Sequence, residues 1–268
     1  MSTCDESDID LDAAIEQAAG RFEKEIALGD DPATPYKPFI TAVRARSRGY
    51  SYRTPGIITG RTHHNLSRGE EGVLQLFDIP EENTNIREQF AVPPSLTWWI
   101  CKKRDWRHPF HEGAPAVLSV DFLINSRRRG RIAVDFKKQG DLEHEDTRRK
   151  LAIVAEALRL VGVPHEIMTE VDLPRVLLRN LRFLHQLALP FDPPPLSQGE
   201  FATAEDRLRA ILRSGRTVIF DAAIQVSAKT GIPARRLSRG ALWCIAQRRW
   251  TVDLNRPVGP DCPVIFLK

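Results

Sequence analysis

The sequence predicts an α/β fold, in which a small mixed sheet packs against helices, followed by a second and smaller helical domain. Segments with alternating apolar residues, typical of strands, lie between segments with apolar residues at helical spacing. Four prolines within residues 190–195 predict a stiff spacer. We therefore expect one domain over residues 36–188, a proline-rich linker over 189–200 and a helical domain over 201–268.

The N-terminal residues 1–35 are rich in acidic residues, glycine and proline, with one predicted helix from about Leu11 to Leu28. We expect a flexible acidic arm here, docked loosely if at all. Short β-like runs with turn residues between them follow from Pro38 to Gly60.

A capping box predicts the start of the next helix. Ser67 and Glu70 have its spacing, in which the serine side chain accepts a hydrogen bond from the glutamate N–H and the glutamate returns one to the serine N–H. The apolar residues from Val73 onward continue at helical spacing. A strand is predicted over Asn85–Val92, and a polar loop rich in tryptophan and arginine follows it.

The middle of the chain contains a predicted hairpin followed by helices. Two apolar strands, Ala116–Ile124 and Arg131–Lys137, are joined by a loop whose Gly130 suits a hairpin turn. A short strand over His165–Glu170 and a leucine-rich helix over Pro174–Leu187 end the domain. Before them lies a long amphipathic helix, whose apolar stripe consists of Leu151, Val154, Leu158 and Val161.

Three charged side chains interrupt the two apolar strands. Because side chains alternate across a strand, Asp135 and Lys137 lie on one face, and hairpin pairing brings Asp121 to the same face. Burying these groups is costly unless something compensates their charges. A hard divalent cation such as Mg²⁺, which prefers oxygen ligands, would do so and would support phosphodiester hydrolysis.

Simpler explanations account for two of these features. On the pattern alone, Asp135 and Lys137 form an ordinary ion pair on a half-exposed strand as readily as they form part of a metal site. The spacing of Glu70 alone favours a helix cap over a metal ligand. Asp121 has no such alternative, since an acid in the middle of an apolar strand is costly to bury.

The order of these motifs resembles that of the TnsA-type endonuclease subunit of heteromeric bacterial transposases. The resemblance covers roughly Pro38 to Leu187 with similar spacings, and it implies a restriction-endonuclease-like core. The matching stretches are TGRTHHNLSRGE, NIREQF, the His108-Pro109 pair, VLSVDFLI, AVDFK, KLAIVAEAL and TEVDLPRVLLRN with its Pro174 and Asn180.

The resemblance implies a metal-dependent DNA endonuclease and assigns its site residues by matched position. It makes Glu70, Asp121 and Asp135 the acidic metal ligands, with the backbone carbonyl of Phe136 also facing the metal. It makes Lys137 the active-site lysine. The metal would be Mg²⁺, and Mn²⁺ would be able to substitute.

Two positions need care when these roles are transferred. Glu71 lies next to Glu70, and the ungapped spacing to NIREQF selects Glu70. The helix after Lys150 contains only Glu156, whereas some relatives have acids in the middle of this helix. This departure from the pattern removes support for a second metal site that depends on this helix, and the number of metal ions stays open.

The same resemblance implies a role in cut-and-paste DNA transposition. The chain would hydrolyse the 5′ ends of a mobile element, so its DNA substrate would be the transposon ends. A DDE-type transposase subunit (TnsB-like) would cut and join the 3′ ends, and an ATP-dependent regulator (TnsC-like) would contact the chain. Two alternatives stay open: a stand-alone restriction or repair nuclease of the same fold, and a non-catalytic adaptor that links transposase and regulator.

The segment 201–268 predicts three helices followed by two short strands, which is the outline of a winged-helix domain. Arginine is frequent after Arg207, and the whole chain has a net charge of +4. The arginines of the third helix and its end would bind DNA phosphates or a partner protein equally well: Arg235, Arg236, Arg239, Arg248 and Arg249.

Composition predicts a soluble intracellular protein with no membrane partner. The resemblance implies a cytoplasmic protein of a bacterium that is associated with the nucleoid when active. No apolar run approaches the about 20 residues that cross a bilayer, and the acidic N-terminus is unlike a signal peptide. The four cysteines are far apart, which argues against disulfides and a zinc site. Without a Walker A motif, we expect no ATP hydrolysis by the chain itself.

Overall fold

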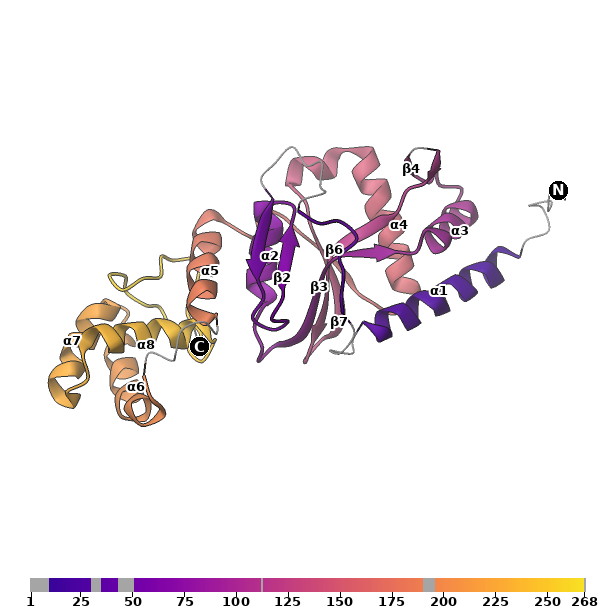
Figure 1. Ribbon diagram of the computed structural model, residues 1–268. Coiled ribbons are helices and arrows are strands. Elements are labelled where there is room, and N and C mark those ends of the chain that lie inside the picture. Colours follow the sequence, from indigo (N-terminus) through magenta and orange to yellow (C-terminus); the bar gives the residue numbers. More distant parts are fainter. Residues whose placement is uncertain (1–9, 30–34, 43–50, 112, 190–195, 268) are drawn as a thin grey trace. The chain divides into compact units, whose positions relative to one another are not determined.

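The chain divides into two compact units, which are described separately (Figure 1). The computed structural model describes residues 10–29, 35–42, 51–111, 113–189 and 196–267. The first unit consists of Met1–Thr54 and Thr62–Asp172, and the second of Pro55–Arg61 and Leu173–Lys268. The division falls before the leucine-rich helix, whereas the sequence placed a linker after it, at 189–200.

A four-stranded mixed sheet forms the centre of the first unit (Figure 1). Its strands, in spatial order, are β3 (Asn83–Val92), β6 (Leu118–Ser126), β7 (Gly130–Phe136) and β8 (His165–Met168). The two pairs β3–β6 and β6–β7 are antiparallel, whereas β8 lies parallel to β7. β6 and β7 form the predicted hairpin, with Gly130 at φ 70°. The mixed α/β architecture is confirmed.

Helices lie on both sides of this sheet (Figure 1). They are α1 (Leu11–Leu28), α2 (Arg68–Phe77), α3 (Pro94–Arg104) and α4 (Glu145–Leu160). Residues of α1, α3 and α4 share one hydrophobic core with the sheet. α2 packs closely on β7, since a Cβ atom added at Gly69 would lie only 2.0 Å from Cε1 of Phe136.

The described part of the N-terminal arm is not loosely docked. α1 has the bounds expected from the sequence, but its apolar side chains Ile15, Ala18, Phe22 and Ile26 are part of the buried core. Their spacing of three and four residues forms one helical stripe, which gains free energy by packing on the sheet and α3. The expectation of a flexible arm underestimated this stripe because acidic residues surround it.

The segment predicted as a polar loop contains the helix α3. Pro94 occupies its first turn, where proline is favourable, and the helix ends at Asp105 with φ 53°. Leu96 and Ile100, four residues apart, are buried and fix the helix on the core. The abundance of tryptophan and arginine concealed this short apolar pair.

Short β elements complete the first unit. β1 (Tyr52–Pro55) pairs with β2 (Thr62–Asn65), and β4 (Phe110–His111) pairs with β5 (Ala114–Pro115). The run GIITG, predicted as β-like, forms a turn between β1 and β2, and β2 was not predicted. Residues 43–50 of the preceding run lie outside the described residues.

The second unit contains four helices over its described residues, α5 (Arg175–Ala188), α6 (Gln198–Leu212), α7 (Ile219–Thr230) and α8 (Ala234–Ala246). The buried side chain of Asn180 joins α5 to the C-terminal segment. Its Nδ2 donates to the carbonyl oxygens of Leu254 at 2.8 Å and Arg256 at 2.6 Å, and its Oδ1 accepts from the N–H of Val258 at 3.1 Å. These bonds explain why α5 groups with the second unit.

The two C-terminal strands predicted after α8 are reduced to an isolated bridge between Val252 and Phe266. Hydrogen bonds from Asp253 N–H to the Ile265 carbonyl (2.8 Å) and from Leu267 N–H to the Thr251 carbonyl (3.0 Å) flank it. The segments run antiparallel, but a winged helix is not established by this arrangement.

Two bulk properties concern the described residues only. None of their helices is long and apolar enough to cross a bilayer. Cys101, Cys244 and Cys262 are free thiols. Burial raises the pKa of Cys101 to about 11 and that of Cys244 to about 12, so both are unreactive at neutral pH.

Candidate functional site

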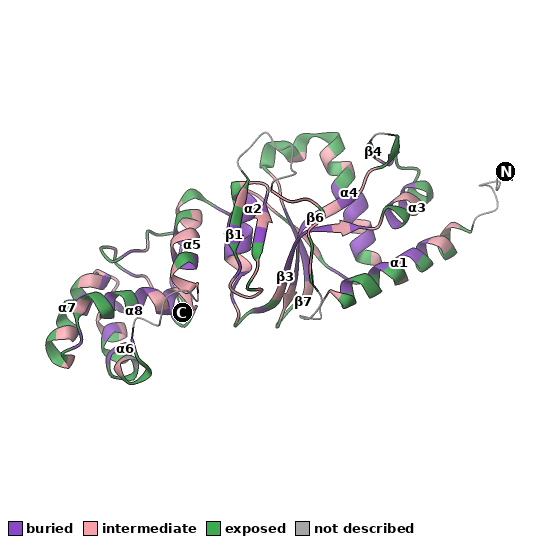
Figure 2. Cartoon of the chain, viewed as in Figure 1, coloured by how far each residue is buried: buried purple, intermediate pink, exposed green. Residues whose placement is uncertain are grey.

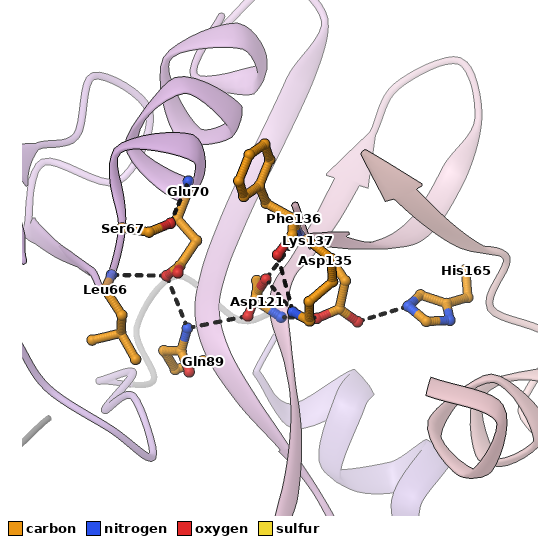
Figure 3. A network of polar contacts seen from close by, with 9 residues as sticks. All are labelled: Leu66, Ser67, Glu70, Gln89, Asp121, Asp135, Phe136, Lys137 and His165. Carbon is orange, nitrogen blue, oxygen red and sulfur yellow. Dashed lines mark hydrogen bonds and ion pairs between the residues drawn. The ribbon is translucent and has the colours of Figure 1, made fainter. Parts of the chain in front are cut away.

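Three oxygen atoms converge on the ammonium group of Lys137 at the end of β7 (Figure 3). Its Nζ lies 2.9 Å from Oδ2 of Asp121 and 2.9 Å from Oδ1 of Asp135. The backbone carbonyl oxygen of Phe136 accepts a third hydrogen bond from the same Nζ at 3.1 Å. The structure thus brings together the two strand carboxylates, the lysine and the carbonyl that the sequence singled out.

Strand pairing produces this arrangement. Phe122 lies opposite Val134, so Asp121 and Asp135 on adjacent strands come close together. The Asp121 carboxylate accepts from the Phe136 N–H at 2.8 Å, and the Asp135 carboxylate accepts from the Asp121 N–H at 3.4 Å. Both aspartates are buried, and they line a pocket of about 360 Å³ that residues of α4 also line.

Glu70 of α2 is connected to this cluster through Gln89. Its Oε2 accepts from the Leu66 N–H at 2.8 Å and from Nε2 of Gln89 at 3.2 Å, and that Nε2 lies 3.5 Å from Oδ1 of Asp121. Ser67 caps α2 by accepting from the Glu70 N–H at 3.1 Å. The predicted capping box is half formed, because the Glu70 carboxylate bonds to Leu66 and Gln89 instead of returning a bond to Ser67.

Gln89 is a residue of the site that sequence reasoning missed. It lies in β3 with φ 49°, a left-handed conformation that costs a non-glycine residue about 1–3 kcal/mol. Its buried side chain lies between Glu70 and Asp121 (Figure 3). A polar residue within NIREQF was visible in the sequence, but alternation alone gave no reason to choose it.

His165, the first residue of β8, was also missed. Its Nε2 lies 2.7 Å from Oδ2 of Asp135, and its side chain is 6% exposed. Asp135 therefore contacts Lys137 through one oxygen and His165 through the other (Figure 3). The parallel pairing of β8 with β7 creates this contact, and no local pattern predicts it.

The three carboxylates differ in their affinity for a proton. Burial raises the pKa of Asp121 well above its ordinary value, and the charge of Asp135 raises it further. Burial also raises the pKa of Glu70. At Asp135 burial acts in the same direction, but hydrogen bonds from His165 and Lys137 outweigh it, so the pKa is lowered. Three acids around one lysine thus favour an additional cation or proton.

Lys137 is held in its protonated form. Burial alone would lower its pKa, but the charges of Asp121 and Asp135 have the larger combined effect, so the pKa is raised. The ammonium therefore already acts as a cation among oxygen ligands.

The donor set around Lys137 fits a hard metal ion. Two carboxylates and a carbonyl are the oxygen ligands that Mg²⁺ and Mn²⁺ prefer, and all three already bond to one cationic atom. Over the described part of the chain, no three His, Cys, Asp or Glu side chains are grouped closely enough to hold a metal by themselves. The amide of Gln89 lies between Glu70 and Asp121, so Asp121, Asp135 and the Phe136 carbonyl are the nearest candidate ligands.

Comparison with known proteins gives one informative relative. No protein-family model matches the chain. The transposon Tn7 transposition protein TnsA of Escherichia coli is 29% identical to it over 161 residues. The chain is homologous to TnsA over this stretch. The match spans 59% of this chain and 59% of the relative's own length. The resemblance found in the order of motifs is thereby confirmed.

Glu156, the acid that follows Lys150 in α4 of this TnsA homologue, forms ion pairs with two arginines. Glu156 pairs with Arg104 of α3 at 2.7 Å and with Arg159 at 2.8 Å. Hydrogen bonds from Arg159 and then Arg104 lower the pKa of Glu156 to about 2. The carboxylate of Glu156 is therefore engaged in these ion pairs.

The five arginines predicted to bind DNA or a partner have different environments in the TnsA homologue. Arg235 and Arg239 line one pocket of about 340 Å³. Arg236 forms a bidentate ion pair with Glu200, with N–O distances of 2.6 and 2.8 Å. The two beyond α8 are Arg248, at φ 56°, and Arg249, whose guanidinium lies 4.9 Å from the ring centre of Trp243.

Proposed function

We propose that this chain is the metal-dependent DNA endonuclease subunit of a heteromeric transposase, and that it hydrolyses the 5′ ends of a mobile element during cut-and-paste transposition. The observation that supports this most directly is the convergence of Asp121, Asp135, Lys137 and the Phe136 carbonyl in a homologue of TnsA. The mixed sheet with helices on both sides is consistent with a restriction-endonuclease-like core.

Each side chain has a role that follows from its environment. Asp121, Asp135 and the Phe136 carbonyl would hold Mg²⁺ or Mn²⁺, and Glu70 would complete the set of acids. A bound metal ion supplies a Lewis acid that polarises the phosphodiester and lowers the pKa of the attacking water.

Lys137 and His165 would assist without binding the metal. Because its pKa is raised, Lys137 is unsuited to remove a proton, and it would stabilise the negative charge that develops on the phosphate. His165, through its contact with Oδ2, would hold the carboxylate of Asp135 in position. Hydrolysis by this route needs no covalent intermediate and no nucleotide.

The partners follow from the same proposal. A DDE-type transposase subunit (TnsB-like) would cut and join the 3′ ends, and an ATP-dependent regulator (TnsC-like) would control assembly. The helices and C-terminal segments of the second unit would form a winged-helix domain that binds DNA or one of these partners. Arg235 and Arg239 are candidates for such contacts, because they line one pocket.

The test is transposition reconstituted with the partner subunits and a donor DNA. Asp121→Ala and Lys137→Ala are expected to reduce 5′ cutting by about 100-fold or more and to leave 3′ joining intact, so that copy-in products accumulate. Glu156→Gln, which removes an acid of α4 outside the pocket, serves as the control and is expected to cut normally.

The alternatives give different results in this assay. Wild-type 5′ nicking by Asp121→Ala would refute the site assignment. Unchanged transposition by the same variant would support a non-catalytic adaptor, whereas efficient cutting of DNA by the protein alone would support a stand-alone restriction or repair nuclease.

A further inference from the structure

A second pocket in the first unit contains a group of cations next to the candidate metal site. This pocket has a volume of about 330 Å³, and its lining includes Arg107, Phe110, Arg149 and Lys150. Lys150 also lines the pocket that contains Asp121, Asp135 and Lys137. The two pockets therefore adjoin at Lys150.

The charges of the second pocket are unbalanced. Asp146 also lines it, and this carboxylate forms an ion pair with Arg149. The side chains of Arg107 and Lys150 have no hydrogen bond or ion pair with any of the residues that the structure describes. Two unpaired cations in one concave surface attract an anion. When the anion is a polyanion such as DNA, they can bind one backbone phosphate or two successive ones.

An exposed aromatic ring lies beside these cations. Phe110 in β4 is 56% exposed, and Figure 2 shows β4 as exposed. The rings of Trp98 and His108 pack nearly perpendicular to it, with centroid distances of 5.8 and 6.3 Å, and hold it in place. An aromatic ring next to cations is the combination with which proteins contact the bases and the backbone of a nucleic-acid strand.

We propose that this pocket binds a backbone phosphate of the DNA strand that is cut, on a nucleotide next to the scissile phosphate. Arg107 and Lys150 contact the phosphate, and Phe110 packs against the adjoining base. A strand that leaves the metal site meets Lys150 first, because this residue belongs to both pockets. This inference rests on the proposed function, which it deepens by locating the path of the substrate.

The salt dependence of DNA binding by the full-length protein tests the proposal. Binding of a fluorescent element-end duplex is measured by anisotropy over a series of KCl concentrations, with Ca²⁺ in place of Mg²⁺ to prevent cutting. Arg107→Gln and Lys150→Gln are each expected to weaken binding and to lower the slope of log K against log salt by about 1. Phe110→Ala is expected to weaken binding about tenfold when the duplex ends in unpaired nucleotides.

A matched control separates this site from general charge effects. Arg148→Gln removes the same charge from the same helix, at a residue that is exposed and does not line the pocket, and it is expected to leave the slope unchanged. Three results would overturn the inference. The first is that Arg148→Gln weakens DNA binding as much as the pocket variants do. The others are a wild-type salt slope in the Arg107→Gln Lys150→Gln double variant and the absence of DNA binding by the wild-type protein. The inference would also be overturned if the double variant bound DNA normally but no longer bound the transposase subunit. That result would indicate that the pocket binds an acidic protein segment.

Cutting distinguishes failure of this inference from failure of the proposed function. In the reconstituted reaction the Arg107→Gln Lys150→Gln double variant is expected to cut at the wild-type rate when DNA is saturating. It is expected to need a higher DNA concentration to reach that rate. If Asp121→Ala still cuts while the arginine and lysine variants lose binding as described, the pocket binds a DNA phosphate but the nuclease site is elsewhere, so the proposed function fails while phosphate binding by the pocket is retained.

Discussion

Asp121 and Asp135 both contact the same ammonium group, yet their surroundings change their affinity for protons in opposite directions. Burial and the charge of Asp135 raise the pKa of Asp121, and Lys137 is its one cationic partner among the residues that the structure describes. Asp135 has His165 as well as Lys137, and its pKa is lowered. A proton therefore competes with a cation more strongly at Asp121 than at Asp135.

This difference predicts opposite effects of two similar substitutions on the metal-free protein. The ordinary pKa of aspartate is about 3.9. Because the folded pKa of Asp121 lies above this value, its ionisation destabilises the fold as the pH rises through the folded pKa. Asp121→Asn is therefore expected to raise the melting temperature at neutral pH in EDTA.

Asp135→Asn is the matched comparison, and it is expected to lower the melting temperature under the same conditions. A lowered pKa means that ionised Asp135 stabilises the fold above the ordinary pKa, and that this stability is lost as the pH falls through the folded pKa. Thermal unfolding of the two variants measures both directions. A lower melting temperature for Asp121→Asn would contradict the role assigned to burial.

Among the residues of the candidate site, the sequence predicted those that the alternation of side chains along a strand can reveal. Asp121, Asp135 and Lys137 stand out because they are charged residues among apolar neighbours on one face. Gln89 and His165 do not, because their importance depends on an unusual φ angle in β3 and on the parallel pairing of β8. Glu70 was ambiguous for a real reason, since its N–H is bonded by the capping serine while its carboxylate is directed to Gln89.

At the scale of elements, the contact between α2 and β7 controls the geometry of the site. Gly69 allows the helix to approach the ring of Phe136, whose carbonyl is one of the candidate ligands, and Glu70 follows directly in α2. Any side chain at position 69 would push α2 away from β7 or displace the ring.

Gly69→Ala is expected to lower the free energy of unfolding by about 1–3 kcal/mol, the usual cost of overpacking, and to weaken binding of Mn²⁺. Gly20→Ala is the control, because a Cβ at Gly20 in α1 would meet nothing within 4 Å. It is expected to raise stability by about 0.5–1 kcal/mol and to leave metal binding unchanged. Urea unfolding measures the stability of the two variants, and Mn²⁺ titration measures their metal affinity. Normal Mn²⁺ affinity in Gly69→Ala would show that the contact between α2 and β7 does not shape the site.

Elements with a long periodic pattern were predicted well, including α1 and α4 with their apolar stripes. The failures were short elements whose stability comes from distant neighbours. α3 depends on the core beneath Leu96 and Ile100, and β2 depends on pairing with β1. The docking of α1 and the grouping of α5 with the second unit are tertiary features, so residue patterns along the chain did not reveal them.

At the scale of the whole molecule, every residue of the candidate metal site belongs to the first unit. The arginines proposed to contact DNA or partners near α8 belong to the second. The candidate metal site and the proposed phosphate-binding pocket thus lie in the first unit, whereas the arginines near α8 lie in the second.

Metal binding is therefore expected to protect one unit and not the other. A ligand present at 100 times its Kd stabilises the state that binds it by about 2.7 kcal/mol. Hydrogen exchange followed by mass spectrometry should show that Mn²⁺ slows exchange in peptides of β6, β7 and α4, and that EDTA reverses this. Peptides of α6 to α8 should exchange as before, and Asp121→Ala should abolish the effect. Equal protection in both units would contradict the assignment.

The site is also continuous in sequence, since its residues lie between Ser67 and His165. Domains generally fold in the order in which the ribosome synthesises them. A nascent chain can therefore contain every residue of the candidate site before α5 to α8 have been made. During that interval the ion pairs of Lys137 with both aspartates can already form, because all three residues lie in the first unit.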